Sequence, residues 1–98
     1  MNNLRDKLTK ELETVEWAAI VPHFERGGVV EIDQSLNLVD VGIAMANDNS
    51  EIVSAWLKDG LMTQPDEAKT QIWKSEKTTF QFLIVQPYVL IQKVALHS

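Results

Sequence analysis

The last third of the chain limits the fold more than any other segment. From Thr78 to Val94, apolar and β-branched residues follow the alternating pattern that is typical of β-strands. One straight strand of this length would span more than about 50 Å at about 3.3 Å per residue, whereas a globule of 98 residues has a radius of gyration of only about 12–13 Å. The segment must therefore turn or bend, and Gln86-Pro87 is the candidate position. Two forms remain open: a hairpin, and a kinked strand with the proline on a sheet edge.

Five helices are predicted before this segment. In the first of them, Leu4, Leu8 and Leu12 recur every four residues on one face. Polar residues predict the helix starts, with Asn2 or Asn3 capping the first helix, Thr14 the second and Asp48 the fourth. The predicted helices cover residues 2–13, 17–25, 38–47, 50–59 and 65–77.

The helix over Leu38–Asn47 is apolar nearly all round, which predicts a central position with other elements on several sides. Gly42 within it is explained if a neighbouring backbone approaches closely. Strands are expected at Val29–Asp33, half-buried, and at Leu61–Thr63. The order of elements predicts an α+β fold, with residues 1–98 as a single domain: a short, mainly antiparallel sheet packs against the central apolar helix, and further helices lie around it.

Composition and motifs exclude several kinds of function. The chain has no cysteine, which excludes a disulfide framework, a thiolate zinc site and a cysteine nucleophile. Nine basic against fourteen acidic residues give a net charge of −5, the wrong sign for nucleic-acid binding. Metal-ligand, EF-hand and glycine-rich phosphate motifs are absent, so we expect neither a metal nor a cofactor. Without a signal peptide or a membrane-spanning stretch, the expected compartment is the cytoplasm and no membrane partner is expected.

Three residues carry a hypothesis of small-molecule binding or weak hydrolysis. Glu31 and Asp33 share one face of the predicted strand, as a carboxylate pair for acid–base chemistry would. His23 would act as a general base. The alternative interpretations are structural: the two acids form the solvated side of a half-buried strand, and His23 lies at a helix C-terminus, where its cationic form suits the helix dipole. The other histidine, His97, is penultimate.

Asp40 is an acid among apolar neighbours, so it is either a buried carboxylate with a raised pKa or an acid in the first turn of its helix. Two aromatic residues are candidates for interaction with a partner. Trp73 lies on a helix with little else to bury, and Tyr88 follows Pro87. Together they would line a shallow apolar patch. The alternative is that Trp73 only anchors its own helix to the sheet.

The chain also resembles a family of small bacterial proteins known as domain of unknown function 2288. The resemblance runs from Leu12 to Lys93 and is most specific in two segments, Leu36-Asn-Leu-Val-Asp-Val41 and Val85-Gln-Pro-Tyr-Val-Leu-Ile-Gln92. The family pattern has aspartate at the position of Asn37, alanine at Gly42 and tryptophan at Tyr88, so a role for an acid at position 37 does not carry over. The resemblance implies a bacterial cytoplasmic protein and brings no activity, ligand or catalytic residue.

These observations favour a non-catalytic cytoplasmic protein that acts through protein–protein contact or self-association, with a homodimer as one form. Residue types that act in catalysis in other proteins have structural explanations in this chain, namely packing and helix capping. The rival hypothesis remains the small-molecule binder or weak hydrolase that uses Glu31, Asp33 or His23, and it requires those side chains to converge in one pocket.

Overall fold

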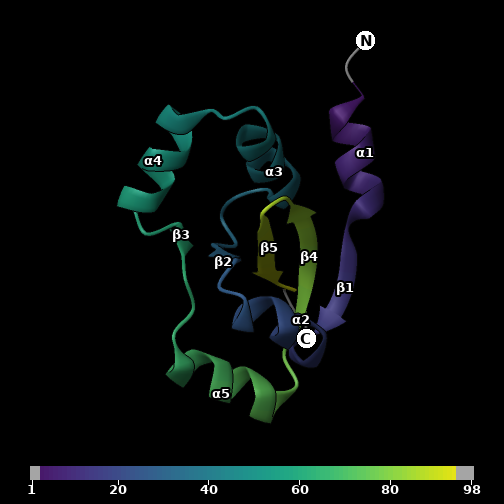
Figure 1. Ribbon diagram of the computed structural model, residues 1–98, viewed down its shortest axis with the longest axis vertical. Coiled ribbons are helices and arrows are strands. Elements are labelled where there is room, and N and C mark those ends of the chain that lie inside the picture. Colours follow the sequence, from purple (N-terminus) through teal and green to yellow (C-terminus); the bar gives the residue numbers. More distant parts are fainter. Residues whose placement is uncertain (1–2, 95–98) are drawn as a thin grey trace.

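The computed structural model describes residues 3–94, so His97 lies outside the described residues. Helices and strands are interspersed along this part of the chain, as Figure 1 shows. The elements are α1 (Leu4–Glu11), β1 (Glu13–Glu16), α2 (Trp17–Glu25), β2 (Val29–Ile32), α3 (Leu38–Ala46), α4 (Ser50–Lys58), β3 (Met62–Thr63), α5 (Glu67–Glu76), β4 (Thr79–Val85) and β5 (Tyr88–Lys93). The predicted helices are all present within a few residues of their expected bounds.

The five strands form one sheet in the order β1-β4-β5-β2-β3. Strands β2 and β5 are parallel, and the other neighbouring pairs are antiparallel. The predicted α+β class and the mainly antiparallel sheet are therefore confirmed. The parallel pair lies inside the sheet, where helices cover both faces, as parallel strands generally require.

The C-terminal segment forms a hairpin, which decides between the two forms that the sequence left open. Strands β4 and β5 pair without interruption up to Val85 and Tyr88, and Gln86 and Pro87 form the two-residue connection between them. The Gln86–Pro87 peptide bond is cis. This hairpin supplies two of the three inner strands, and its side chains pack against helices on both faces of the sheet.

Side chains alternate along the hairpin between two separate cores. On one face of the sheet, Leu83 and Leu90 pack with Val30 of β2 and with buried residues of α1 and α3. On the other face, Phe80 and Ile91 pack with residues of α2 and α5. The prediction of a half-buried strand at 29–33 is therefore wrong at its start, because Val29 and Val30 point to opposite faces and both are buried.

Helix α3 is central, as predicted, and contacts α1, α4, β4 and β5. Gly42 allows the helix to approach the sheet closely. The atoms that lie against it belong to side chains and not, as predicted, to a neighbouring backbone. A Cβ atom at position 42 would lie 2.8 Å from Cδ2 of Leu83 and 3.2 Å from Cδ1 of Leu8. The missing side chain thus makes room for two leucines of the first core, which offsets the poor helix propensity of glycine.

Three aromatic rings form the centre of the second core. The ring centroids of Trp73 and Phe80 lie 4.9 Å apart, and those of Trp17 and Trp73 lie 5.2 Å apart, within the range of favourable aromatic pairs. Trp73 is only 2% exposed and holds α5 against the sheet. Ile72, its neighbour on the same helix, is 53% exposed and contributes little to that attachment.

Strand β1 lies where the sequence predicts only a short connection between the first two helices. Residues 13–16 pair with Thr79–Phe82 of β4, yet only Val15 of these four is partly buried. A strand with so little apolar alternation leaves no sequence signal, because its stability comes from main-chain pairing with β4. Thr14 lies in this strand and is not a helix cap.

The predicted cap of α4 is also corrected. Asn49 caps α4, since its side-chain oxygen accepts a hydrogen bond from the Ile52 amide at 3.5 Å. Asp48 precedes it in the left-handed backbone region, with a φ of 54°. At the start of α1, Asn3 occupies the cap position but its side chain makes no capping hydrogen bond, and Asn2, the other predicted cap, lies outside the described residues. Asn49 is therefore the cap, and Asp48 adopts the positive φ. Asparagine and aspartate both serve as caps and both tolerate a positive φ, so the sequence does not decide between the two positions.

We expect the second core to depend on Trp73. Replacement of Trp73 with alanine should lower the free energy of unfolding by about 3–5 kcal/mol, because it removes a buried ring from contact with Trp17 and Phe80. Ile72→Ala is the matched control on the same helix and should change it by less than about 0.5 kcal/mol. Urea denaturation of both variants provides the measurement. Equal stabilities of the two would show that the aromatic cluster does not anchor α5.

Candidate functional site: an apolar pocket beside helix α4

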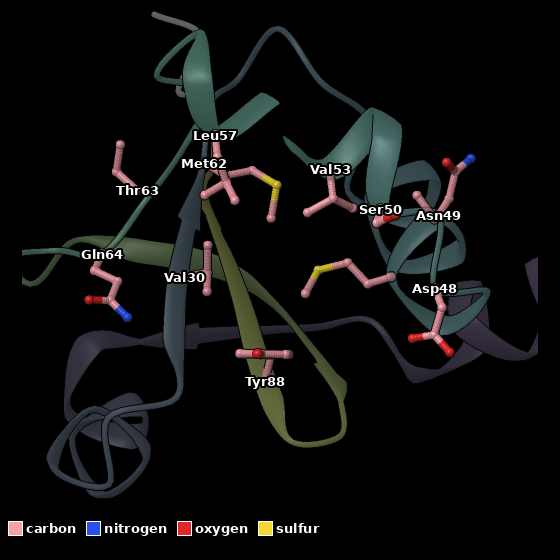
Figure 2. Close-up of a pocket in the computed structure, with 12 residues that line it drawn as sticks. Val30, Asp48, Asn49, Ser50, Val53, Leu57, Met62, Thr63, Gln64 and Tyr88 are labelled. Carbon is pink, nitrogen blue, oxygen red and sulfur yellow. The ribbon is translucent and has the colours of Figure 1, made fainter. Parts of the chain in front are cut away.

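An apolar pocket opens between α4, the end of α3 and the sheet. It has a volume of about 340 Å³. Figure 2 shows its residues as sticks: Val30, Ala44, Met45, Asp48, Asn49, Ser50, Val53, Leu57, Met62, Thr63, Gln64 and Tyr88. They come from five elements and two connections, so the pocket exists only in the folded chain.

The floor and the walls of the pocket are apolar. Val53 and Met62 point into it from opposite sides, and the ring of Tyr88 lies at its base in the view of Figure 2. Met45 adds a second thioether side chain. Methionine adapts its shape to different neighbours, and methionine and tyrosine are both common where proteins bind partners.

The position of α4 creates the pocket. This helix contacts α3 and β3, and none of its residues is fully buried. Val53 and Trp56 pack partly against the first core, whereas Leu57 is 54% exposed. The apolar face of α4 is therefore wider than the part that α3 and β3 cover. The uncovered part forms one wall of the pocket.

The polar groups of the pocket lie at its rim. Asp48 is the only carboxylate among the lining residues, and it is exposed. The amide of Asn49 turns away from the cavity in Figure 2, consistent with its role as the cap of α4. Ser50 has no base beside it among the lining residues, as nucleophilic catalysis would need. The arrangement is suited to holding an apolar group and not to acid–base chemistry.

Tyr88 and Trp73, the two predicted interaction residues, occupy different places. Tyr88 is 44% exposed and lines the pocket. Trp73 is buried in the second core, on the opposite side of the sheet, and borders a different cavity between α2 and α5. Trp73 therefore anchors its own helix to the sheet, which was the alternative interpretation of this residue. The rings of Trp73 and Tyr88 do not line one patch.

Glu31, Asp33 and His23 are not brought together. The carboxylate of Glu31 forms an ion pair with Nζ of Lys69 at 2.7 Å, which links β2 to α5. Asp33 lies just beyond β2, where one carboxylate oxygen accepts a hydrogen bond from the amide of Ser35 at 2.9 Å. The ring of His23 packs at a tilt of 56° against Phe82, with ring centroids 5.5 Å apart.

His23 also lines a small cavity of about 150 Å³ at the hairpin turn, to which neither Glu31 nor Asp33 contributes. Among residues 3–94, no group of three or more histidine and acidic side chains is arranged to hold a metal ion. Asp40 is half exposed, and its carboxylate contacts the guanidinium of Arg5 at 2.7 Å. Its amide is the group that Asn37 caps, so Asp40 is the first-turn acid of α3 and not a buried one.

The sequence predicts the helix that carries Val53 and Leu57 but does not single these residues out for a pocket. The stripe of Ile52, Val53, Trp56 and Leu57 is a strong amphipathic signal, but such a signal does not say how much of the stripe a neighbour will cover. Met45 and Met62 carried no distinguishing signal at all. In the described part of the chain, no helix is long and apolar enough to cross a membrane.

Comparison with known proteins places the chain in a family. Residues 3–93 match the profile described as "Protein of unknown function (DUF2288)". The chain belongs to this family. The resemblance inferred from the sequence is therefore confirmed, and it covers nearly the whole of the described chain.

A solved structure of similar fold agrees with this assignment. The solution NMR structure of PA1075 from Pseudomonas aeruginosa shares 33% sequence identity and superposes with a TM-score of 0.80. The match covers 99% of this chain and 94% of that one. None of the curated proteins compared with the chain matches it. The α+β fold is therefore found in a bacterial relative, and neither description states a function.

The environment of Asp33 predicts an acid-dependent contribution to stability. Hydrogen bonds from the hydroxyl and then the main-chain amide of Ser35 hold the pKa of Asp33 below its ordinary value of 3.8. A carboxyl group whose pKa is lower in the folded state stabilises the fold above the unfolded pKa, and this contribution is lost as the pH falls through the folded pKa.

Carbon-13 NMR titration of the Asp33 carboxyl should therefore give a midpoint below 3.8. In Ser35→Ala the hydroxyl is lost and the amide remains, so the pKa should move part of the way back towards that value. A midpoint that does not change in Ser35→Ala would show that the hydroxyl has no such effect.

Proposed function

We propose that this protein is a non-catalytic binding protein that acts through contact with another protein, and that the pocket beside α4 receives an apolar side chain of that partner. The observation that supports this most is the exposed apolar wall of the pocket. Leu57 and Tyr88 are both about half exposed, on either side of a cavity whose interior is apolar. Exposed apolar surface around a pocket is typical of interaction sites.

The size of the pocket fits this role. Binding energy at protein interfaces is concentrated in a few residues that fill desolvated pockets, often aromatic ones. A volume of about 340 Å³ has room for one large side chain. The exposed Ile52, one turn before Trp56 on α4, would extend the contact beyond the pocket. The two methionines would adjust to the shape of the inserted group.

A small apolar molecule is the second candidate for the pocket. Ligand pockets generally measure about 300–1,000 Å³, and this one lies at the lower end of that range. In this variant of the proposal, binding relies on the apolar lining and on Tyr88. Glu31, Asp33 and His23 contribute nothing to this pocket, so hydrolysis by these residues has no support from the geometry.

Self-association remains part of the proposal, with a second copy as one of the partners to be tested. The cytoplasm remains the proposed compartment. Nucleic acid is not among the proposed partners, because the net charge of −5 would repel phosphates. Trp73 does not belong to the proposed contact surface, since its ring is buried.

Leu57→Asp provides the test. A carboxylate at the mouth of the pocket should abolish insertion of an apolar group, because burying an unpaired charge is costly. We expect a partner that the immobilised wild-type protein captures from bacterial cytoplasm to be lost with Leu57→Asp. The solution mass at several concentrations, measured for both proteins, shows whether that partner is a second copy.

Ile72→Asp is the matched control, because Ile72 is equally exposed, lies on a helix and occupies the opposite face of the molecule. It should retain the partner. Loss of binding in both variants, or retention in both, would contradict a contact through this pocket.

A further inference from the structure

One edge of β4 is only partly covered by its neighbour. Strand β1 pairs with β4 from Thr79 to Phe82, where Phe82 is opposite Glu13. Strand β4 continues to Val85, and the chain on the β1 side has by then turned into α1. Within the described residues, the C-terminal end of β4 therefore pairs with β5 on one side and with no strand on the β1 side.

The hydrogen-bond register shows which main-chain groups face this open edge. The amide of Val94 donates to the carbonyl of Thr79 at 3.1 Å, so this pair is of the hydrogen-bonded type. In an antiparallel ladder the two types of pair alternate, so Leu83 and Val85 bond to β5, whereas Phe82 and Ile84 face the other side. The N–H and C=O of Ile84 thus both point towards the open edge.

A groove lies along this edge. It has a volume of about 800 Å³ and runs between α1 and β4, with Leu8 and Lys7 on one wall and Phe82, Ile84 and Val85 on the other. The side chains of the β4 wall alternate between the two faces of the sheet. The groove therefore offers apolar contacts above and below the plane in which an added strand would lie.

We propose that this groove is a peptide-docking site, in which an extended segment of a partner protein pairs with Ile84 and continues the sheet where β1 leaves it. A residue in extended conformation presents one N–H and one C=O on the same side, which complements the N–H and C=O of Ile84. Addition of a strand to a sheet edge is a common mode of peptide recognition. This site is separate from the pocket beside α4.

The charges of the groove favour an extended peptide over a charged small molecule. Lys7 and Lys10 are offset by Glu11 and Glu13 along the same wall, so the lining has no net charge to select an anion or a cation. Recognition then depends on main-chain hydrogen bonds and on apolar contacts. A peptide with alternating apolar side chains satisfies both.

The test uses an acetylated and amidated hexapeptide of alternating lysine and valine as the probe. The free protein should exchange the Ile84 amide hydrogen much faster than those of Leu83 and Val85. Saturation with the peptide should slow exchange at Ile84 at least tenfold. A fully N-methylated version of the peptide keeps the side chains but donates no main-chain hydrogen bond, and it should have no such effect.

Two variants at one position separate the main chain from the side chain. Ile84→Pro removes the outward N–H without breaking a bond to β5, and proline is tolerated in a strand where the N–H has no neighbouring strand to bond. It should weaken peptide binding at least tenfold relative to Ile84→Ala, which retains the N–H. Should Ile84→Pro fail to fold, the exchange measurement on the wild-type protein decides alone.

Unchanged exchange at Ile84 with the peptide present would overturn the proposal, as would equal protection by the N-methylated peptide. Protection of Ile84 that rises with protein concentration in the absence of peptide would identify a second copy as the occupant and would also overturn it. Loss of the pocket contact in Leu57→Asp has no bearing on this result, because the groove does not include that residue.

Discussion

The structure depends on the register of the β4–β5 hairpin. Because successive side chains of a strand point to opposite faces, one alternating segment supplies apolar residues to both sides of the sheet at once. Leu83 and Leu90 enter the core shared with α1 and α3, and Phe80 and Ile91 enter the core shared with α2 and α5. A shift of one residue in the pairing would exchange these sets and misfit both cores. A chain of 98 residues thereby covers both faces of a five-stranded sheet with helices.

Both candidate binding regions lie where this coverage is incomplete. Helix α4 carries more apolar surface than α3 and β3 can cover, and the remainder forms the pocket with Tyr88. Strand β1 is shorter than β4, and the remainder of β4 faces a groove at the open edge. In each case the uncovered feature defines the chemistry of the partner that we propose. Among residues 3–94, nothing covers part of the apolar surface at the pocket, and no strand pairs with the outward N–H and C=O of Ile84 at the edge.

The acids that the sequence singled out hold parts of the fold together. Glu31 joins β2 to α5 through Lys69, Asp40 joins α3 to α1 through Arg5, and Asp33 closes a turn with Ser35. None of these three contacts places a second carboxylate or a histidine beside the acid. The family assignment and the fold shared with PA1075 agree on the architecture and leave the activity to experiment.

Local patterns in the sequence determined the helices, the α+β class, the need for a turn at Gln86-Pro87 and the family. These features can be read from the sequence because they depend on the periodicity of neighbouring residues and on the length of the chain. Tertiary structure alone decided the strand β1, whose four residues carry almost no apolar signal, and the burial of both faces at Val29 and Val30. It also decided that Trp73 is buried while Leu57 is exposed, because burial depends on which elements meet in space. The pocket and the open edge belong to this second group, since each is the part of an element that no other segment between residues 3 and 94 covers.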